Sequence, residues 1–251
     1  MEQDVANKPY HNIVMVAAPV RESLLRKPVE AVAKRIADHL GAFRVYHFND
    51  TSDEAKVKNG CNVDDNRYLR PQAENLAAIL YWIQEKHPNH LALIEDTIRQ
   101  IAPFFDRFQL APRKLNESQI NLQWKEVGND DFFNAHALSD GTLRFICLVT
   151  LLFQPELPSI IILDEPELGL HPAAVGLLAS MLKSAAETTQ VIVATQSVTL
   201  VNQFGPDVVW TVDRESGQSV FRHLAQADMS GWLDDYSLGE LWEKNQLGAR
   251  P

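Results

Sequence analysis

Short aliphatic runs alternate along this chain with longer segments in which apolar residues recur at helical spacing. The runs at residues 160–163 and 191–194 are purely aliphatic and too short for helices. Runs of this kind are typical of strands that are buried on both faces of a parallel sheet. Residues 143–152 and 173–187 instead predict helices, the second of them starting at Pro172. This alternation predicts an α/β fold with a mostly parallel central sheet.

The first 112 residues predict one or two sheet strands and a helical insertion. The polar stretch 49–71 predicts a long loop or insertion. The elements expected around it are a strand or buried turn over 13–18, a helix over 28–40 with its C-cap at Gly41, a strand over 43–48, and helices over 73–85 and 90–101 separated by a proline turn at 87–89. We therefore treat residues 1–112 as an N-terminal segment with a helical insertion.

Residues 113–251 predict a C-terminal lobe that contains the two aliphatic strands. Its other expected elements are a β-hairpin leading into it, formed by 108–111 and 120–126, a final hairpin formed by 208–213 and 219–223, and short amphipathic helices over 228–235 and 238–245. Trp232 and Trp242 are the expected packing anchors of those two helices.

Two carboxylates, Asp164 and Glu165, directly follow the aliphatic run at 160–163. The carboxyl ends of strands are where open α/β sheets bind ligands. One acid in this position can hold Mg²⁺, which prefers oxygen ligands. The next acid can orient or deprotonate a water molecule during phosphoryl transfer. The alternative is that the two acids simply begin a solvated loop.

Two further polar segments stand before and after this acidic pair. Ser139 or Asp140 can cap the helix that contains 143–152, and Gly141 follows them. Free backbone N–H groups at such a helix start can bind a phosphate, although an ordinary capped core helix is the alternative. The second segment, Thr-Gln-Ser at 195–197, follows the other aliphatic run; its alternative is a capping loop before the next helix.

In their order along the chain, these segments resemble the nucleotide-site motifs of ABC-type ATPases. Residues 138–144 resemble the signature, and residues 160–165 resemble the Walker B strand with its catalytic acid. Residues 169–172 resemble the D-loop, and residues 195–197 resemble the switch loop. The set is similar to the SMC/RecF-like branch, and most similar to stand-alone bacterial ATPases of the AAA type that are related to the ATPase half of OLD-family proteins. The resemblance extends over residues 43–251 and implies an incomplete P-loop NTPase fold of three layers with an α-helical insertion.

The resemblance also implies roles for five residues. Asp164 would hold Mg²⁺, and Glu165 would be the general base for the attacking water. Gln196 would sense the γ-phosphate of ATP at a position where many ABC ATPases have histidine. Glutamine can orient water by hydrogen bonding but cannot accept its proton near neutral pH. Ser139 and Gly141 would reach the ATP that is held by the opposite subunit of a dimer.

Two residues of the signature-like segment carry charge. Asp140 stands where signatures most commonly have glycine. Its carboxylate is expected to point away from the nucleotide, because a second anion beside the phosphates would weaken binding. Arg144 lies one helical turn later and is expected either to pair with Asp140 or to be solvated at the surface.

The Walker A loop of the family has no counterpart in this sequence. None of the eleven glycines is followed by lysine, so the Gly-x4-Gly-Lys-[Ser/Thr] cradle for the phosphates is missing. Three explanations stay open: the Walker A lobe lies on another chain, the chain is a remnant that regulates a full-length relative, or the recorded start lies downstream of the true one.

Two functions therefore compete. The first is an ATP-binding and ATP-hydrolysing domain that acts as a dimerisation-coupled switch, in DNA repair or phage defence, as a homodimer or with a Walker A-bearing partner chain. The second is a non-catalytic interaction module that lends its signature helix to such a partner. An OLD-like nuclease is set aside, because the tail after the switch loop is too short for a further metal-binding lobe.

The composition of the chain limits which partners and which cellular compartment we expect for this protein. Asp and Glu number 33 against 23 Lys and Arg, so the net charge is −10, which argues against a broad nucleic-acid surface. A local basic patch on a dimer stays open. No apolar run approaches the roughly 18 residues of a membrane span. The two cysteines show no metal-binding pattern and suit a reduced cytoplasm, where we expect the protein.

Overall fold

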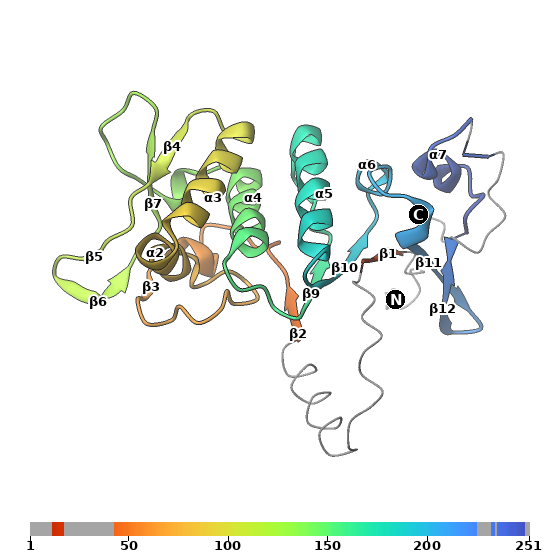
Figure 1. Cartoon of the computed structure of the whole chain (residues 1–251), viewed down its shortest axis with the longest axis horizontal. Coiled ribbons are helices and arrows are strands. Elements are labelled where there is room, and N and C mark those ends of the chain that lie inside the picture. Colours follow the sequence, from red (N-terminus) through yellow and green to blue (C-terminus); the bar gives the residue numbers. More distant parts are fainter. Residues whose placement is uncertain (1–11, 18–42, 225–231, 234, 249–251) are drawn as a thin grey trace, which may run out of the picture.

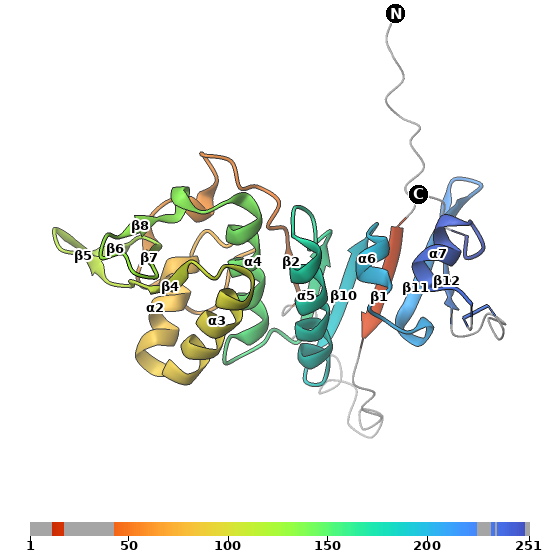
Figure 2. The ribbon, with the colours of Figure 1, turned by 90° about the horizontal axis from the view of Figure 1, so that it is seen from above.

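A mixed six-stranded sheet forms the centre of the computed structural model, which describes residues 12–17, 43–224, 232–233 and 235–248. The strand order is β12-β11-β1-β10-β9-β2 (Figures 1 and 2). The strands are β1 Asn12–Ala17, β2 Phe43–Tyr46, β9 Ile160–Asp164, β10 Gln190–Thr195, β11 Val209–Glu215 and β12 Gln218–His223. The α/β class predicted from the hydrophobic pattern is confirmed, but the expectation of a mostly parallel sheet is wrong for the described strands, because two of their pairings are parallel and three are antiparallel.

Three neighbouring strands of this sheet are parallel. On β9, Ile162 is paired in parallel with Ile192 of β10 on one side and with Val45 of β2 on the other. β1 runs antiparallel to both β10 and β11 and lies between them, so of the two alternatives left open for residues 13–18, a strand or a buried turn, the structure has the strand. β11 and β12 form the expected final hairpin, which turns at Ser216 and Gly217, both with positive φ.

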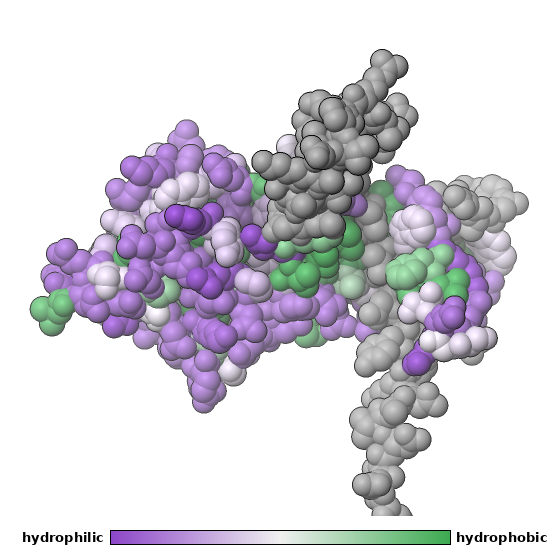
Figure 3. All heavy atoms as spheres, turned by 90° about the horizontal axis from the view of Figure 1, so that it is seen from below, coloured by the Kyte–Doolittle hydropathy of each residue, from purple (hydrophilic) through white to green (hydrophobic). Residues whose placement is uncertain are grey.

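In Figure 1, α5 Pro172–Ala186, α6 Val198–Val201 and α7 Leu238–Glu243 lie above this sheet, and α4 Asp140–Phe153 lies beside α5. Every residue of α4 from 143 to 152 is buried. Burial alternates along β9, because Ile161 and Leu163 are buried whereas Ile160 and Ile162 are partly exposed. The strand is therefore less evenly covered than its aliphatic sequence predicted. Figure 3 shows the molecule from below relative to Figure 1, and hydrophobic residues gather near the middle of that face.

A helical part lies beside α4 at the left of Figure 1. Its helices are α2 Leu76–Lys86 and α3 Pro88–Ile101, and both were predicted. Only His87 separates them, because Pro88 occupies the first turn of α3, where its missing N–H costs nothing. The smaller elements are β3 Cys61–Asn62, β4 Phe105–Phe108, β5 Pro112–Arg113, β6 Asn116–Ile120, β7 Gln123–Glu126, β8 Phe133–Asn134 and the 3₁₀ turns Lys56–Lys58, Ala135–Ala137 and Pro206–Val208.

The hairpin expected from 108–111 and 120–126 is wrong in its first strand. β4 begins at Phe105 and pairs with β7, with Phe108 opposite Trp124. A separate short hairpin, β5 with β6, lies between them in sequence. The register shifts between Phe105 and Arg107. Such a bulge breaks the two-residue alternation by which a strand is recognised in sequence.

A buried asparagine organises the polar segment at 65–70. The side-chain oxygen of Asn75 accepts a hydrogen bond from the backbone N–H of Arg70 at 2.9 Å, and its nitrogen donates to the carbonyls of Asp65 and Tyr68. Asn75 is fully buried. A buried amide with all these partners fixes the loop against the start of α2.

The C-terminal tail differs from its prediction at one tryptophan. Trp242 is only 1% exposed and anchors α7, as expected. Trp232 is 49% exposed and therefore is not a core anchor. The helices predicted over 28–40 and over most of 228–235 lie outside the described residues. Of the described helices, none combines the length and the apolar character that a membrane crossing requires.

The two cysteines are expected to differ in reactivity. Cys147 is buried in α4, and burial raises its pKa to about 12, whereas Cys61 is only partly buried and its pKa is raised by the same cause. Because the thiolate is the reactive form, alkylation at pH 8 should modify Cys61 slowly and Cys147 only after unfolding. Mass spectrometry of the native and urea-treated protein measures this, and rapid native labelling of Cys147 would contradict the packing of α4.

Candidate functional site

The carboxyl ends of β2, β9 and β10 meet at one edge of the sheet, since the three strands are parallel. His47 follows β2, Asp164 ends β9 and is followed by Glu165, and Gln196 follows β10. Ligands of open α/β sheets bind at this edge. The structure therefore brings together the acidic pair and the glutamine that the sequence singled out.

Glu165 and Gln196 are in direct contact. Nε2 of Gln196 donates a hydrogen bond to Oε1 of Glu165 at 3.0 Å, and the backbone N–H of Glu165 donates to the carbonyl of Ala194 at 2.8 Å. Glu165 has a φ of +45°, in the left-handed region that side chains other than glycine avoid. Strain of this kind is concentrated at functional sites, where the side chain must be held in place.

The strain at Glu165 can be measured. Relative to Glu165→Ala, which keeps the unfavourable φ, Glu165→Gly should raise the free energy of unfolding by about 1 kcal/mol. Both variants lose the hydrogen bond to Gln196, so the difference isolates the backbone. Ser216, at an exposed turn, also has a positive φ, +50°, and serves as the matched control. The free energy of unfolding of Ser216→Gly should exceed that of Ser216→Ala by a similar amount. Equal stability of the glycine and alanine variants in urea titrations would contradict strain at Glu165.

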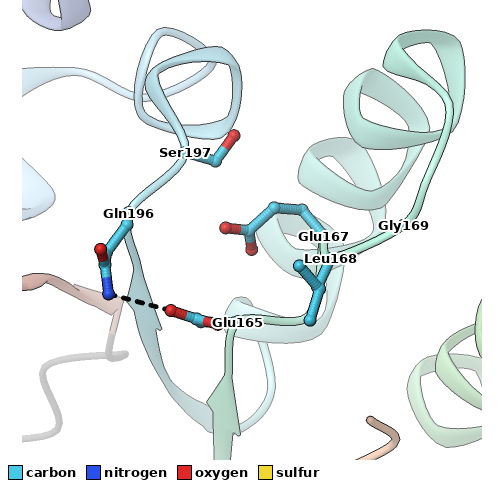
Figure 4. Close-up of a pocket in the computed structure, with 6 residues that line it drawn as sticks. All are labelled: Glu165, Glu167, Leu168, Gly169, Gln196 and Ser197. Carbon is cyan, nitrogen blue, oxygen red and sulfur yellow. Dashed lines mark hydrogen bonds between the residues drawn. The ribbon is translucent and has the colours of Figure 1, made fainter.

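A cavity of about 300 Å³ opens beside the Glu165–Gln196 contact (Figure 4). In Figure 4 the carboxylates of Glu165 and Glu167 both point from the loop after β9 toward the loop after β10. The cavity is lined by Glu165, Glu167, Leu168, Gly169, Gln196 and Ser197. It is thus built from the end of the Walker B-like strand, the D-loop-like segment and the switch-like loop.

Asp164 lies beside this cavity and does not line it. Its side chain is 47% exposed, and Oδ2 is 3.8 Å from Nδ1 of His47. No group of three or more His, Cys, Asp or Glu side chains in the described ranges could hold a metal ion alone. Mg²⁺ is usually bound by one or two carboxylates together with phosphate oxygens and water. An accessible carboxylate such as Asp164 therefore fits a metal that is shared with a nucleotide.

Glu167 is a functional candidate that the sequence reasoning did not single out. Its Oε1 accepts a hydrogen bond from Oγ1 of Thr195, and its Oε2 is buried without a hydrogen-bond partner. Burial raises the pKa of Glu167; the bond from Thr195 opposes this rise and the charges of Glu165 and Asp164 add to it. In the sequence, the one sign that Glu167 could belong to the site was its position two residues after Glu165. That spacing alone does not show which way the side chain points.

The signature-like helix start packs against the D-loop-like segment. Ser139 caps α4, because its Oγ accepts from the backbone N–H of Thr142 at 3.2 Å, and its side chain is exposed. A Cβ on Gly141 would lie 2.6 Å from the carbonyl oxygen of Gly169. Glycine at 141 is therefore required by a contact within the chain. Neither Ser139 nor Gly141 lines the cavity beside Glu165.

Arg144 neither pairs with Asp140 nor points into solvent, so both expectations for it are wrong. It is 5% exposed, and its guanidinium donates to the carbonyls of Phe48 at 2.9 Å, Asn49 at 3.0 Å and Leu168. One buried cation thus joins the loop after β2, helix α4 and the loop after β9. The charge is satisfied by carbonyl dipoles, which is how a buried cation avoids a large desolvation penalty.

Asp140 has a different partner. Its Oδ1 is 3.9 Å from Nζ of Lys58, whose side chain is only 5% exposed and which also lies 3.8 Å from Asp53. The polar loop 49–71 is therefore joined to the start of α4 through Lys58.

The strained carboxylate, the glutamine and the accessible aspartate lie at the carboxyl edge of parallel strands, which is where α/β domains with open sheets bind ligands. Residues 23–202 match the family model described as "AAA domain, putative AbiEii toxin, Type IV TA system", and the chain belongs to this family. Membership assigns the chain to the nucleotide-binding, ATPase-type domains. No curated protein matches the sequence.

Solved structures with a similar fold include three SMC proteins. An SMC ATPase, described with its ATP-driven dimerization and DNA-stimulated activation, is 18% identical with a TM-score of 0.45, and the match covers 62% of this chain and 95% of that one. An SMC head bound to the C-winged helix domain of ScpA is 18% identical with a TM-score of 0.48, covering 66% and 50%. An SMC head from Pyrococcus furiosus, bound to the C-terminal domain of ScpA, is 18% identical with a TM-score of 0.45, covering 64% and 44%.

Proposed function

We propose that this chain supplies the Walker B, switch and signature parts of an ATP site, and that it hydrolyses ATP when the site is completed across a subunit interface. The observation that carries the proposal is the hydrogen bond between Gln196 and Glu165 beside a cavity at the carboxyl edge of the sheet. A carboxylate that already orients an amide is well placed to orient water against a phosphate.

Each residue has a role in this proposal. Glu165 is the general base for the attacking water, and Gln196 orients that water and contacts the γ-phosphate. Asp164 holds Mg²⁺, which supplies charge neutralisation at the phosphate oxygens when bound. The strain at Glu165 supports the assignment, because the fold keeps a glutamate where glycine would be more stable.

The signature serves a second subunit in this proposal. Ser139 is exposed and does not line the cavity of its own chain, so the start of α4 is accessible to another chain's nucleotide, for which the Ser139 hydroxyl would give up its contact with Oγ1 of Thr142, 2.8 Å away. The completing subunit is a second copy or a Walker A-bearing partner. A switch in DNA repair or phage defence is the cellular role that we propose for the assembly.

A non-catalytic interaction module is the second candidate. β1, the neighbour of β10, is antiparallel, with Ile13 opposite Thr195, so its N-terminal end is at the cavity edge. A phosphate-cradling loop follows the carboxyl end of its strand and leads into a helix. β1 therefore delivers no such loop to the cavity, which favours a module that lends α4 to a partner.

Measurement of MgATP binding and turnover separates the two functions. The purified chain is assayed alone over a range of protein concentrations, and mixed with a Walker A-bearing protein of the same family. An ATPase predicts saturable binding and turnover that rises more steeply than protein concentration, because the site needs two subunits. A module predicts no binding by the chain alone at millimolar ATP and a change only in the partner's turnover.

A further inference from the structure

The side chain of Glu167 connects the loop after β9 to the loop after β10 (Figure 4). Its Oε1 accepts a hydrogen bond from Oγ1 of Thr195, the last residue of β10. Thr195 is fully buried, so its hydroxyl cannot exchange this partner for bulk water. The contact therefore ties the two loops together beneath the cavity.

The hydrogen bonds continue from Thr195 through the switch-like loop. Oγ1 of Thr195 also accepts from the backbone N–H of Ser197 at 2.9 Å. Oγ of Ser197 in turn accepts from the backbone N–H of Leu200 at 3.1 Å, at the start of α6. Gln196 lies between these two anchored residues, and its exposed side chain reaches Glu165.

The second carboxylate oxygen of Glu167 makes no hydrogen bond to another protein group. Oε2 is buried and has no hydrogen-bond partner, and an unsatisfied buried acceptor is unfavourable. An apolar residue at 167 would avoid that cost but would remove the acceptor for Thr195. A carboxylate at 167 therefore supplies an acceptor to Thr195 that an apolar side chain would not.

We propose that Glu167 is a positioning residue that holds the switch-like loop, through Thr195, in the conformation that places Gln196 on Glu165. This inference rests on the proposed function, because it explains how the water-orienting pair is kept in register. Glu167 acts through Thr195 and Gln196 and takes no part in the chemical step.

Amide hydrogen exchange of the full chain without nucleotide tests the proposal by itself. In Glu167→Met, which keeps the length of the side chain without an acceptor, the Ser197 amide should exchange on the order of tenfold faster. Glu167→Gln keeps an acceptor and should stay within about twofold of wild type. Thr195→Val removes the acceptor of the Ser197 amide directly. It therefore sets the upper limit of the exchange rate at Ser197, and the rate in Glu167→Met should approach that limit. Glu187→Met, at the far end of α5, is the control for loss of a carboxylate.

Wild-type exchange at Ser197 in Glu167→Met, with fast exchange in Thr195→Val, would overturn the proposal. Should Glu167→Met fail to fold, Glu167→Ala takes its place with the same criteria.

Turnover gives a second readout. The assay uses the preparation that hydrolyses ATP, either the chain alone or the chain with a Walker A-bearing partner. There, Glu167→Met should lower kcat about tenfold with little change in KM for MgATP, and Glu167→Gln should have a kcat close to that of the wild type. If the wild-type chain binds no ATP, the proposed function fails, while the exchange experiment still decides the role of Glu167.

Discussion

Replacing Arg144 with alanine is expected to lower the free energy of unfolding by about 4 kcal/mol, a large effect for one substitution. The guanidinium donates to three backbone carbonyls, those of Phe48, Asn49 and Leu168. All three lose a charge-assisted partner in the variant, and buried acceptors without partners are costly. Urea titration followed by circular dichroism measures the change.

Two further substitutions make this result specific. Arg144→Lys keeps the charge but not the planar fork, so it should recover only part of the lost stability. Arg107→Ala removes an exposed arginine that pairs with Asp106 at 3.3 Å, and should cost less than about 1 kcal/mol. A loss at Arg144 as small as that at Arg107 would contradict the role of Arg144 in joining the three segments.

Glu165→Gln is expected to lower the turnover of ATP by about two to four orders of magnitude while leaving MgATP binding nearly unchanged. Glutamine keeps the size and hydrogen-bonding capacity of the side chain but cannot accept a proton from water. The assay uses the preparation in which the wild-type chain hydrolyses ATP, and it measures kcat and KM separately.

The matched control for this variant is Glu187→Gln. Glu187 is exposed and follows α5 at the end of the helix opposite to Pro172, so it is remote from the cavity. It should leave both kinetic constants unchanged. Turnover retained in Glu165→Gln at the wild-type level would exclude Glu165 as the general base and leave the interaction module as the better account.

The sequence predicted the parts of the site that depend on local pattern. Two aliphatic strands with polar residues directly after them are sufficient to bring Asp164, Glu165 and Gln196 to one edge, because the carboxyl ends of parallel strands meet there. The cap of α4 was predicted at Ser139 or Asp140, because the preference for such residues at a helix start is local, and the structure has it at Ser139.

Contacts between distant segments could not be predicted in this way. Arg144 bonds to the carbonyl of Phe48, a residue 96 positions away, and a backbone acceptor leaves no trace in the sequence. The spacing of one helical turn suggested Asp140 as its partner, whereas the fold buries the side chain of Arg144 and offers backbone carbonyls instead. The bond from Thr195 to Glu167 spans 28 positions and depends on the parallel pairing of β9 with β10.

Hydrogen exchange of the full chain with and without MgATP, in the presence of a Walker A-bearing partner, tests the central claim most directly. Nucleotide bound at the carboxyl edge of the sheet should protect backbone amides in residues 164–170 and 195–200, with smaller changes at the far ends of the same strands. Binding of MgATP to the assembly without any change in those two segments would contradict the assignment of this edge as the nucleotide site.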